Sequence, residues 1–123
     1  MLNLLKKGLA FSHISSEESF LAFYKVLEII SDDLKQSKDE GRNSDFLKDI
    51  IKYNLVERPS QRLKIYFLVK FLDIEDFNLS KYISIADTRN DLSHSDKKIN
   101  ENQAMIVQNL AFSAFNKYLL RFN

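Results

Sequence analysis

The 123-residue sequence has no cysteine and only two histidines, His13 and His94, which stand far apart along the chain. Without cysteine the protein forms no disulfide and offers no thiolate to a metal. Two well-separated histidines also exclude a histidine-rich metal site. We therefore expect neither a metal nor another cofactor. We interpret His13 as a surface or helix-capping residue, so that His94 is the histidine to consider for chemistry.

Glycine and proline are also scarce, with two copies of the first and one of the second. An all-β fold needs many tight turns, and such turns usually contain these residues. The apolar fraction of 45%, with ten phenylalanines and five tyrosines, is typical of a folded chain with a hydrophobic core. The length suits one domain. The sequence predicts a single all-α domain over residues 1–123, in which residues 1–14 are either an N-terminal extension or the remnant of an upstream domain.

The chain lacks a charge excess and long apolar runs. Its net charge of +1 argues against a protein that coats nucleic acid through bulk electrostatics, so any contact with RNA must be local. The segment Met1–Lys7 has too short an apolar core for a signal peptide, and no later run approaches the roughly 20 apolar residues of a membrane span. We expect a cytoplasmic protein with no membrane partner.

Two helix starts carry capping signatures, in which the side chains of the first and fourth residues bond to each other's backbone N–H groups. These signatures are Ser15 with Glu18 and Asn100 with Gln103. The helix after Ser15 is expected to run to about residue 37, and the one after Asn100 to close the chain. Their apolar residues at helical spacing, interpreted as core rather than as a base-stacking surface, are Phe20, Phe23, Tyr24, Leu27, Ile30 and Leu34, then Met105, Val107, Leu110, Ala111, Ala114, Phe115, Tyr118 and Leu119.

The remaining helices are less clearly marked. Residues 2–11 predict a short helix, weakened by Gly8, whose apolar face is Leu2, Leu5 and Leu9. A helix before Pro59 is expected to carry Phe46, Ile50, Ile51 and Leu55. Residues 65–69 have strand propensity, but no partner strand is evident and we interpret residues 60–72 as a buried helix. The predicted architecture is an antiparallel bundle of four main helices plus short helices, with a core supplied mainly by the first and last long helices.

The stretch Arg89-Asn90-Asp91-Leu92-Ser93-His94 brings a cation, an amide and an acid/base group together. The unperturbed pKa of histidine allows it to accept and donate a proton near neutrality. Arginine presents a fixed fork of donors that matches phosphate oxygens. This combination of side chains suits the cleavage of a phosphodiester.

Helical geometry places Asn90 and His94 one turn apart on one face, with Asp87 and Asp91 on the same stripe. Arg89 points roughly 140° away from His94 on an ideal helix. The two can meet if the helix ends just before the histidine, if the arginine stem wraps around, or if they meet across a dimer. The motif therefore predicts a helix end or a partner.

The segment Asp87–His94 resembles the motif of the HEPN superfamily of small helical domains, with asparagine in the polar position after the arginine. The aromatic-rich segment Phe20–Glu28 resembles the opening helix of that family, and most of all its ApeA-like branch. The resemblance extends in helix order from Ser15 to the C-terminus, with its specific part between Arg89 and His94. It implies a HEPN-like helical bundle.

The resemblance also implies a function. Arg89, Asn90 and His94 would be the catalytic residues of a metal-independent endoribonuclease, which cleaves single-stranded RNA by attack of the ribose 2′-hydroxyl. Two protomers would form a homodimer with the active site at the interface between their motif helices. A role in defence or as a toxin, with an antitoxin or an activating domain, is implied as well. One branch carries a modified tyrosine two places after the histidine; this chain has Asp96 there, so that mode of control is not expected.

Four other residues are candidates for supporting roles. Glu28 and Asp87 can orient the catalytic groups, although the alternative for Glu28 is an exposed side chain paired with Lys25 or with a neighbouring helix. Lys97 and Lys98 can hold the RNA backbone, although a lysine pair in a loop is more often simply solvated. A different class of function also remains open, namely a non-catalytic dimeric interaction module in which the motif is a structural network. A generic helical domain that matches the motif by chance is the third interpretation.

Overall fold

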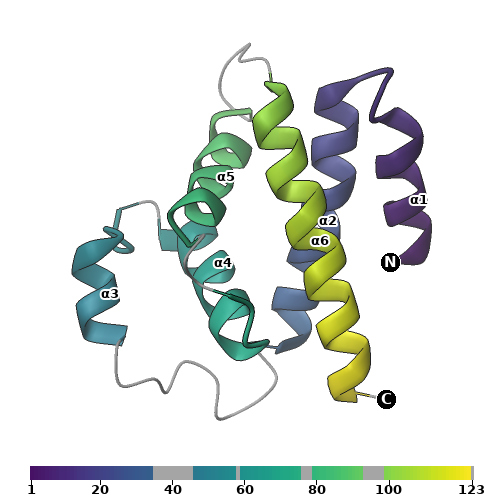
Figure 1. Cartoon of the computed structure of the whole chain (residues 1–123). Helices are drawn as coiled ribbons and strands as arrows, with labels where there is room; N and C mark the ends of the chain where they lie inside the picture. Colours follow the sequence, from purple (N-terminus) through teal and green to yellow (C-terminus); the bar gives the residue numbers. More distant parts are fainter. Residues whose placement is uncertain (35–45, 58, 76–78, 93–98, 123) are drawn as a thin grey trace.

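The computed structural model describes residues 1–34, 46–57, 59–75, 79–92 and 99–122. These residues form helices and no strands (Figure 1). The bounds are α1 Leu2–Phe11, α2 Ser16–Leu34, α3 Phe46–Lys52, α4 Pro59–Phe71, α5 Leu79–Leu92 and α6 Glu101–Phe122. The predicted all-α bundle of four main helices plus short ones is confirmed. The segment with strand propensity lies inside α4 and is helical.

Successive helices of the bundle run in opposite directions (Figure 1). As a result α2, α4 and α6 share one direction, and α2 lies beside both of the others. The hydrogen bonds from Tyr24 to Gln61 and from Ser31 to Lys64 join α2 and α4 in ascending order along both helices. The even-numbered helices therefore form a parallel set, against which α1 and α5 pack in the opposite sense.

The core is centred on α2, which packs against α1, α4 and α6. Phe20, Phe23 and Tyr24 are fully buried, as the apolar stripe predicted. Helix α6 packs extensively on α2, in line with the expectation that these two long helices supply much of the core, although Met105 and Leu119, expected in that core, are exposed by 61% and 37%. Its buried hydrophobic residues are no more numerous than those of α4 or α5 among the described side chains: Ile65, Tyr66, Leu68 and Val69 in α4, Leu79, Ile83, Ile85 and Ala86 in α5, and Val107, Leu110, Ala111 and Ala114 in α6.

Gly8 determines how α1 packs on α2. A Cβ atom at this position would lie 2.6 Å from Cζ of the buried Phe23 ring, so only glycine fits without displacing it. The Ser19 hydroxyl donates a hydrogen bond of 2.8 Å to the Gly8 carbonyl across the same contact. Leu2 and Leu9, expected on the packed face, are exposed by 56% and 47%. The packed face instead centres on Gly8, because its missing side chain permits the close approach.

The helix before Pro59 is shorter than expected. It ends at Lys52, and Asn54 follows with φ 50°. The Leu55 N–H then bonds to the Ile50 carbonyl at 3.0 Å, which is a Schellman cap with asparagine in place of glycine. This cap turns Leu55 into the core outside the helix and leaves Ile51 84% exposed. The expectation that Ile51 would lie on the buried face was therefore wrong.

Both predicted helix starts have their caps. The Ser15 hydroxyl accepts a hydrogen bond of 3.2 Å from the Glu18 N–H. At α6 the cap is reciprocal: the Gln103 N–H bonds to Asn100 Oδ1 at 2.8 Å, and the Asn100 N–H bonds to Gln103 Oε1 at 3.3 Å. Each bond satisfies a backbone donor that the first turn of a helix leaves unpaired.

Replacing Asn100 with alanine is expected to lower the free energy of unfolding by about 1 kcal/mol, because the cap acceptor is lost. Asn100→Asp, which keeps an acceptor, is expected to stay near the wild-type value. Urea denaturation measures both. Asn109→Ala is the matched control, since Asn109 is exposed within the same helix. Equal stability of Asn100→Ala and wild type would contradict the role of the cap.

Candidate functional site

Helix α5 presents the first part of the motif. Ile85 and Ala86 are buried in the core, which fixes the side of the helix that faces inward. Arg89 and Asn90 follow in the last described turn, and both are half-buried. Ser93, His94, Asp96, Lys97 and Lys98 lie outside the described residues. The described part of the candidate site therefore consists of Arg89 and Asn90 with the groups around them.

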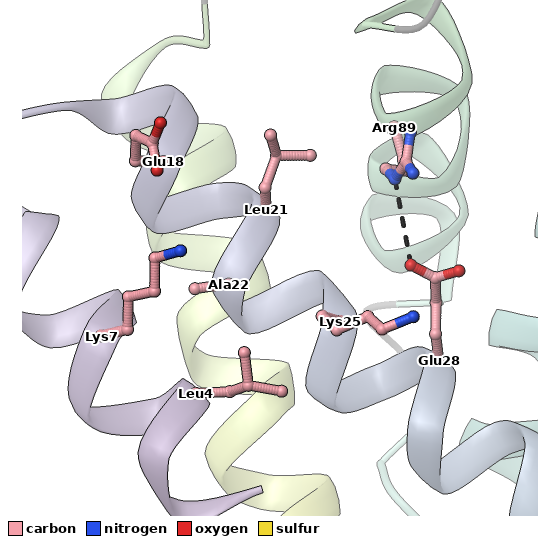
Figure 2. A pocket seen from close by; sticks show the side chains of 8 residues that line it. All are labelled: Leu4, Lys7, Glu18, Leu21, Ala22, Lys25, Glu28 and Arg89. Carbon is pink, nitrogen blue, oxygen red and sulfur yellow. Dashed lines mark ion pairs between the residues drawn. The ribbon is translucent and has the colours of Figure 1, made fainter.

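Glu28 on α2 faces Arg89 on α5. The distance between Glu28 Oε1 and Arg89 Nε is 3.9 Å (Figure 2). The carboxylate side chain is 19% exposed and the arginine side chain 30%. The structure thus places Glu28 beside the motif arginine on a neighbouring helix, and this contact fits both the proposed supporting role and the alternative of a structural pair between helices. At this distance the pair is an ion pair that holds the arginine at the surface rather than in the core.

Asp87 is held by Arg62, a residue that the sequence analysis did not single out. Arg62 Nε and Nη2 donate to the two Asp87 carboxylate oxygens at 2.7 and 2.8 Å. Arg62 Nη1 also donates to the Asn54 carbonyl at 2.8 Å. The hydrogen bonds to Asp87 raise the pKa of Arg62 further above its ordinary value. The two-point contact fixes α5 against α4, so the role of Asp87 in the structure is to orient the motif helix.

Tyr24 lies beneath these charges. Its hydroxyl donates a hydrogen bond of 2.8 Å to Gln61 Oε1. Burial raises the pKa of Tyr24 well above its ordinary value, and the negative charges of Glu28 and Asp87 raise it further, while Arg89 opposes them. The phenol therefore stays neutral at physiological pH and acts as a donor between α2 and α4.

A second polar contact joins α5 to α6. Gln103 Nε2 donates to the Thr88 hydroxyl at 2.7 Å, and this hydroxyl donates to the Ser84 carbonyl at 3.1 Å. Gln103 is also the capping partner of Asn100. One side chain thus ties the end of the motif helix to the start of the next helix.

A surface groove of about 370 Å³ opens next to Arg89. It is formed by residues of α1, α2 and α5 (Figure 2). Its lining residues are Leu4, Lys7, Glu18, Leu21, Ala22, Lys25, Glu28 and Arg89. Helix α1 therefore contributes to the surroundings of the motif arginine. The sequence did not predict this, because residues of α1 and α5 line one groove only in the folded chain.

Within the described ranges, no group of three or more histidine, cysteine, aspartate or glutamate side chains is arranged to hold a metal ion. None of the helices in those ranges combines the length and the apolarity needed to cross a membrane.

Comparisons with family models, with curated proteins and with solved structures found no match to this chain. The chemistry that the site can perform therefore has to follow from its own side chains. A half-exposed arginine, held beside a glutamate at the edge of a groove, can bind a phosphate group from one side. An amide follows it directly on the same helix. Binding and orientation of a phosphodiester are within the reach of these groups.

Proposed function

We propose that this chain is a metal-independent endoribonuclease of the HEPN type, which cleaves single-stranded RNA. The observation that carries the proposal is the placement of Arg89 at the edge of the groove, half-exposed and oriented by Glu28. In the sequence, Asn90 follows it directly and His94 comes four residues after Asn90. The spacing of the motif and the position of its arginine agree with a phosphodiester-binding site.

In the proposed reaction, the ribose 2′-hydroxyl attacks the adjacent phosphorus and the bond to the 5′-oxygen of the next nucleotide breaks. His94 acts as the general acid/base that removes the proton from the 2′-hydroxyl and returns a proton to the leaving 5′-oxygen. Arg89 stabilises the negative charge that develops on the phosphorane oxygens, and Asn90 orients the histidine or the substrate. The products are a 2′,3′-cyclic phosphate and a 5′-hydroxyl.

We further propose that the active form is a homodimer in which the motif helices of two protomers line one cleft. A dimer is one solution to the geometric problem of the motif, since Arg89 and His94 would point roughly 140° apart on an ideal helix, whereas Arg89 of one protomer and His94 of the other can serve one phosphate. A defence or toxin role, with an antitoxin or activating domain that restrains or triggers cleavage, completes the proposal. Lys97 and Lys98 are the proposed contacts to the RNA backbone.

The test is the incubation of the purified protein with an end-labelled single-stranded RNA in excess EDTA. We expect cleavage that yields cyclic-phosphate and 5′-hydroxyl ends, because the nucleophile is the 2′-hydroxyl of the substrate itself. A DNA of the same sequence lacks this nucleophile and is the matched control. Cleavage of the DNA, or loss of RNA cleavage on addition of EDTA, would refute the mechanism.

A non-catalytic dimeric module is the second candidate, and one observation favours it. The polar groups next to the motif pair with each other, Arg89 with Glu28 and Asp87 with Arg62, as in a purely structural network. A folded dimer that leaves RNA intact, both alone and with the rest of its parent protein or its activator, would support this candidate against the nuclease.

A further inference from the structure

We infer that the groove beside Arg89 is a binding subsite for one nucleotide of the RNA, next to the phosphate that is cleaved. This inference rests on the proposed function and deepens it, because it assigns RNA contacts to α1 and α2 as well as to the motif helix.

The groove has an apolar middle and charged ends. Figure 2 shows Lys7 and Glu18 on one side of Leu21 and Ala22, with Lys25, Glu28 and Arg89 on the other. Leu4 from α1 completes the apolar part. A nucleotide has the same division, with an apolar base face and a charged phosphate. Apolar side chains can therefore contact the face of a base while cations at the ends contact phosphates.

The charges of the groove favour an anion. Three cations, Lys7, Lys25 and Arg89, stand against two carboxylates, Glu18 and Glu28, which leaves a local excess of one positive charge. The volume of about 370 Å³ lies within the range of roughly 300–1,000 Å³ that is usual for small-ligand sites. Carboxylate oxygens accept hydrogen bonds, so Glu18 and Glu28 match base N–H or ribose hydroxyl groups rather than phosphates.

Arg89 determines the register of the bound strand, because it lines the groove and is also the proposed phosphate-binding residue. A strand whose scissile phosphate lies on Arg89 reaches the apolar part of the groove with its neighbouring nucleotide. Lys7 and Lys25 then lie close to the flanking phosphates. The role of α1 follows from this register, since Leu4 and Lys7 are its contributions to the site.

The test measures binding of a fluorescein-labelled single-stranded RNA decamer to full-length His94→Ala by fluorescence anisotropy, so that no cleavage occurs. In this background, Lys7→Glu with Lys25→Glu is expected to raise Kd at least about tenfold. The slope of log K against log salt is expected to fall in magnitude by about 1.4, since each phosphate contact on a single strand contributes about 0.7.

The matched control is Lys48→Glu with Lys52→Glu, which makes the same change of charge on exposed residues of α3. Helix α3 lies on the far side of the bundle from α1 (Figure 1). Crosslinking of RNA that contains 4-thiouridine, followed by peptide mapping, locates the base directly and is expected to label the segment around Leu21. This readout separates a bound base from a general attraction between charges.

Equal weakening by the two charge reversals, or crosslinks that map away from α1 and α2, would overturn the subsite. These outcomes leave the proposed function intact if the wild-type protein still cleaves RNA. If the wild-type protein never cleaves RNA but the Lys7 and Lys25 reversals alone weaken binding, the nuclease proposal fails and the groove stands as an RNA-binding site. Absence of any RNA binding would refute both.

Discussion

Arg89→Ala is expected to slow RNA cleavage by a factor of about 100 to 1,000, which is the usual cost of removing one preorganised charge-stabilising group from an active site. The fold should survive, because the ion pair between Arg89 and Glu28 is long, at 3.9 Å, and the Arg89 side chain is 30% exposed. For an ion pair at this distance we expect a loss of roughly 1 kcal/mol or less in the free energy of unfolding. Rates under single-turnover conditions and urea denaturation measure the two effects separately.

Arg89→Lys separates charge from shape. Lysine keeps the positive charge but lacks the planar fork that bonds to two phosphate oxygens together. We therefore expect its cleavage rate to lie between those of the wild type and Arg89→Ala. Arg121→Ala is the matched control, since Arg121 is an exposed arginine that donates to the Phe71 carbonyl at 2.9 Å near the end of α6. Cleavage by Arg89→Ala at the rate of this control would show that Arg89 does not take part in the reaction.

The features of the fold that sequence reasoning predicted are those that depend on near neighbours in the chain. The Asn100 cap needs only Gln103, three residues away, and both hydrogen bonds are present. The apolar stripe of α2 needs only helical spacing, and Phe20 and Phe23 are buried as expected. Local patterns are reliable here because the same few residues both carry the signal and form the contact.

The features of the fold that sequence reasoning missed depend on which helices pack against each other. Leu2 and Leu9 have the spacing of a packed face, yet the close contact between α1 and α2 forms at Gly8, opposite the Phe23 ring. Ile51 has the spacing of a core residue, but α3 is too short and too peripheral to bury it. A pattern on a short helix shows which residues are apolar, but the tertiary neighbours decide which of them are covered.

The candidate site likewise contains residues that the sequence singled out and a residue that only the packing of the helices reveals. The sequence left open whether Glu28 orients Arg89 or His94 or forms a structural pair, and the structure places the Glu28 and Arg89 side chains 3.9 Å apart. Arg62 carried no comparable signal, because it lies 25 positions before Asp87 and only the packing of α4 on α5 brings them together. The placement of His94 lies outside the described residues, so its role remains a prediction.

Arg62→Ala is expected to lower the free energy of unfolding by about 3 kcal/mol. The Arg62 side chain is 13% exposed and the Asp87 side chain 28%, so removal of the guanidinium leaves a poorly hydrated carboxylate between α4 and α5. Arg62→Lys should recover little of this, since an ammonium group cannot bond to both carboxylate oxygens and to the Asn54 carbonyl in the same geometry. Urea denaturation at neutral pH gives the values.

A double-mutant cycle shows whether the loss belongs to the pair. Asp87→Asn combined with Arg62→Ala is expected to lower the free energy of unfolding by about 1 to 2 kcal/mol less than the sum of the two single changes. The reason is that Asp87→Asn removes the carboxylate that Arg62→Ala leaves unpaired. The Lys64 and Asp32 pair is the matched control, at 3.9 Å with the Asp32 side chain 64% exposed, and there we expect a coupling of roughly 0.5 kcal/mol or less. Additive effects at Arg62 and Asp87 would mean that other contacts hold α5 in register, and the orientation of Arg89 would then depend on Glu28 and the helix packing alone.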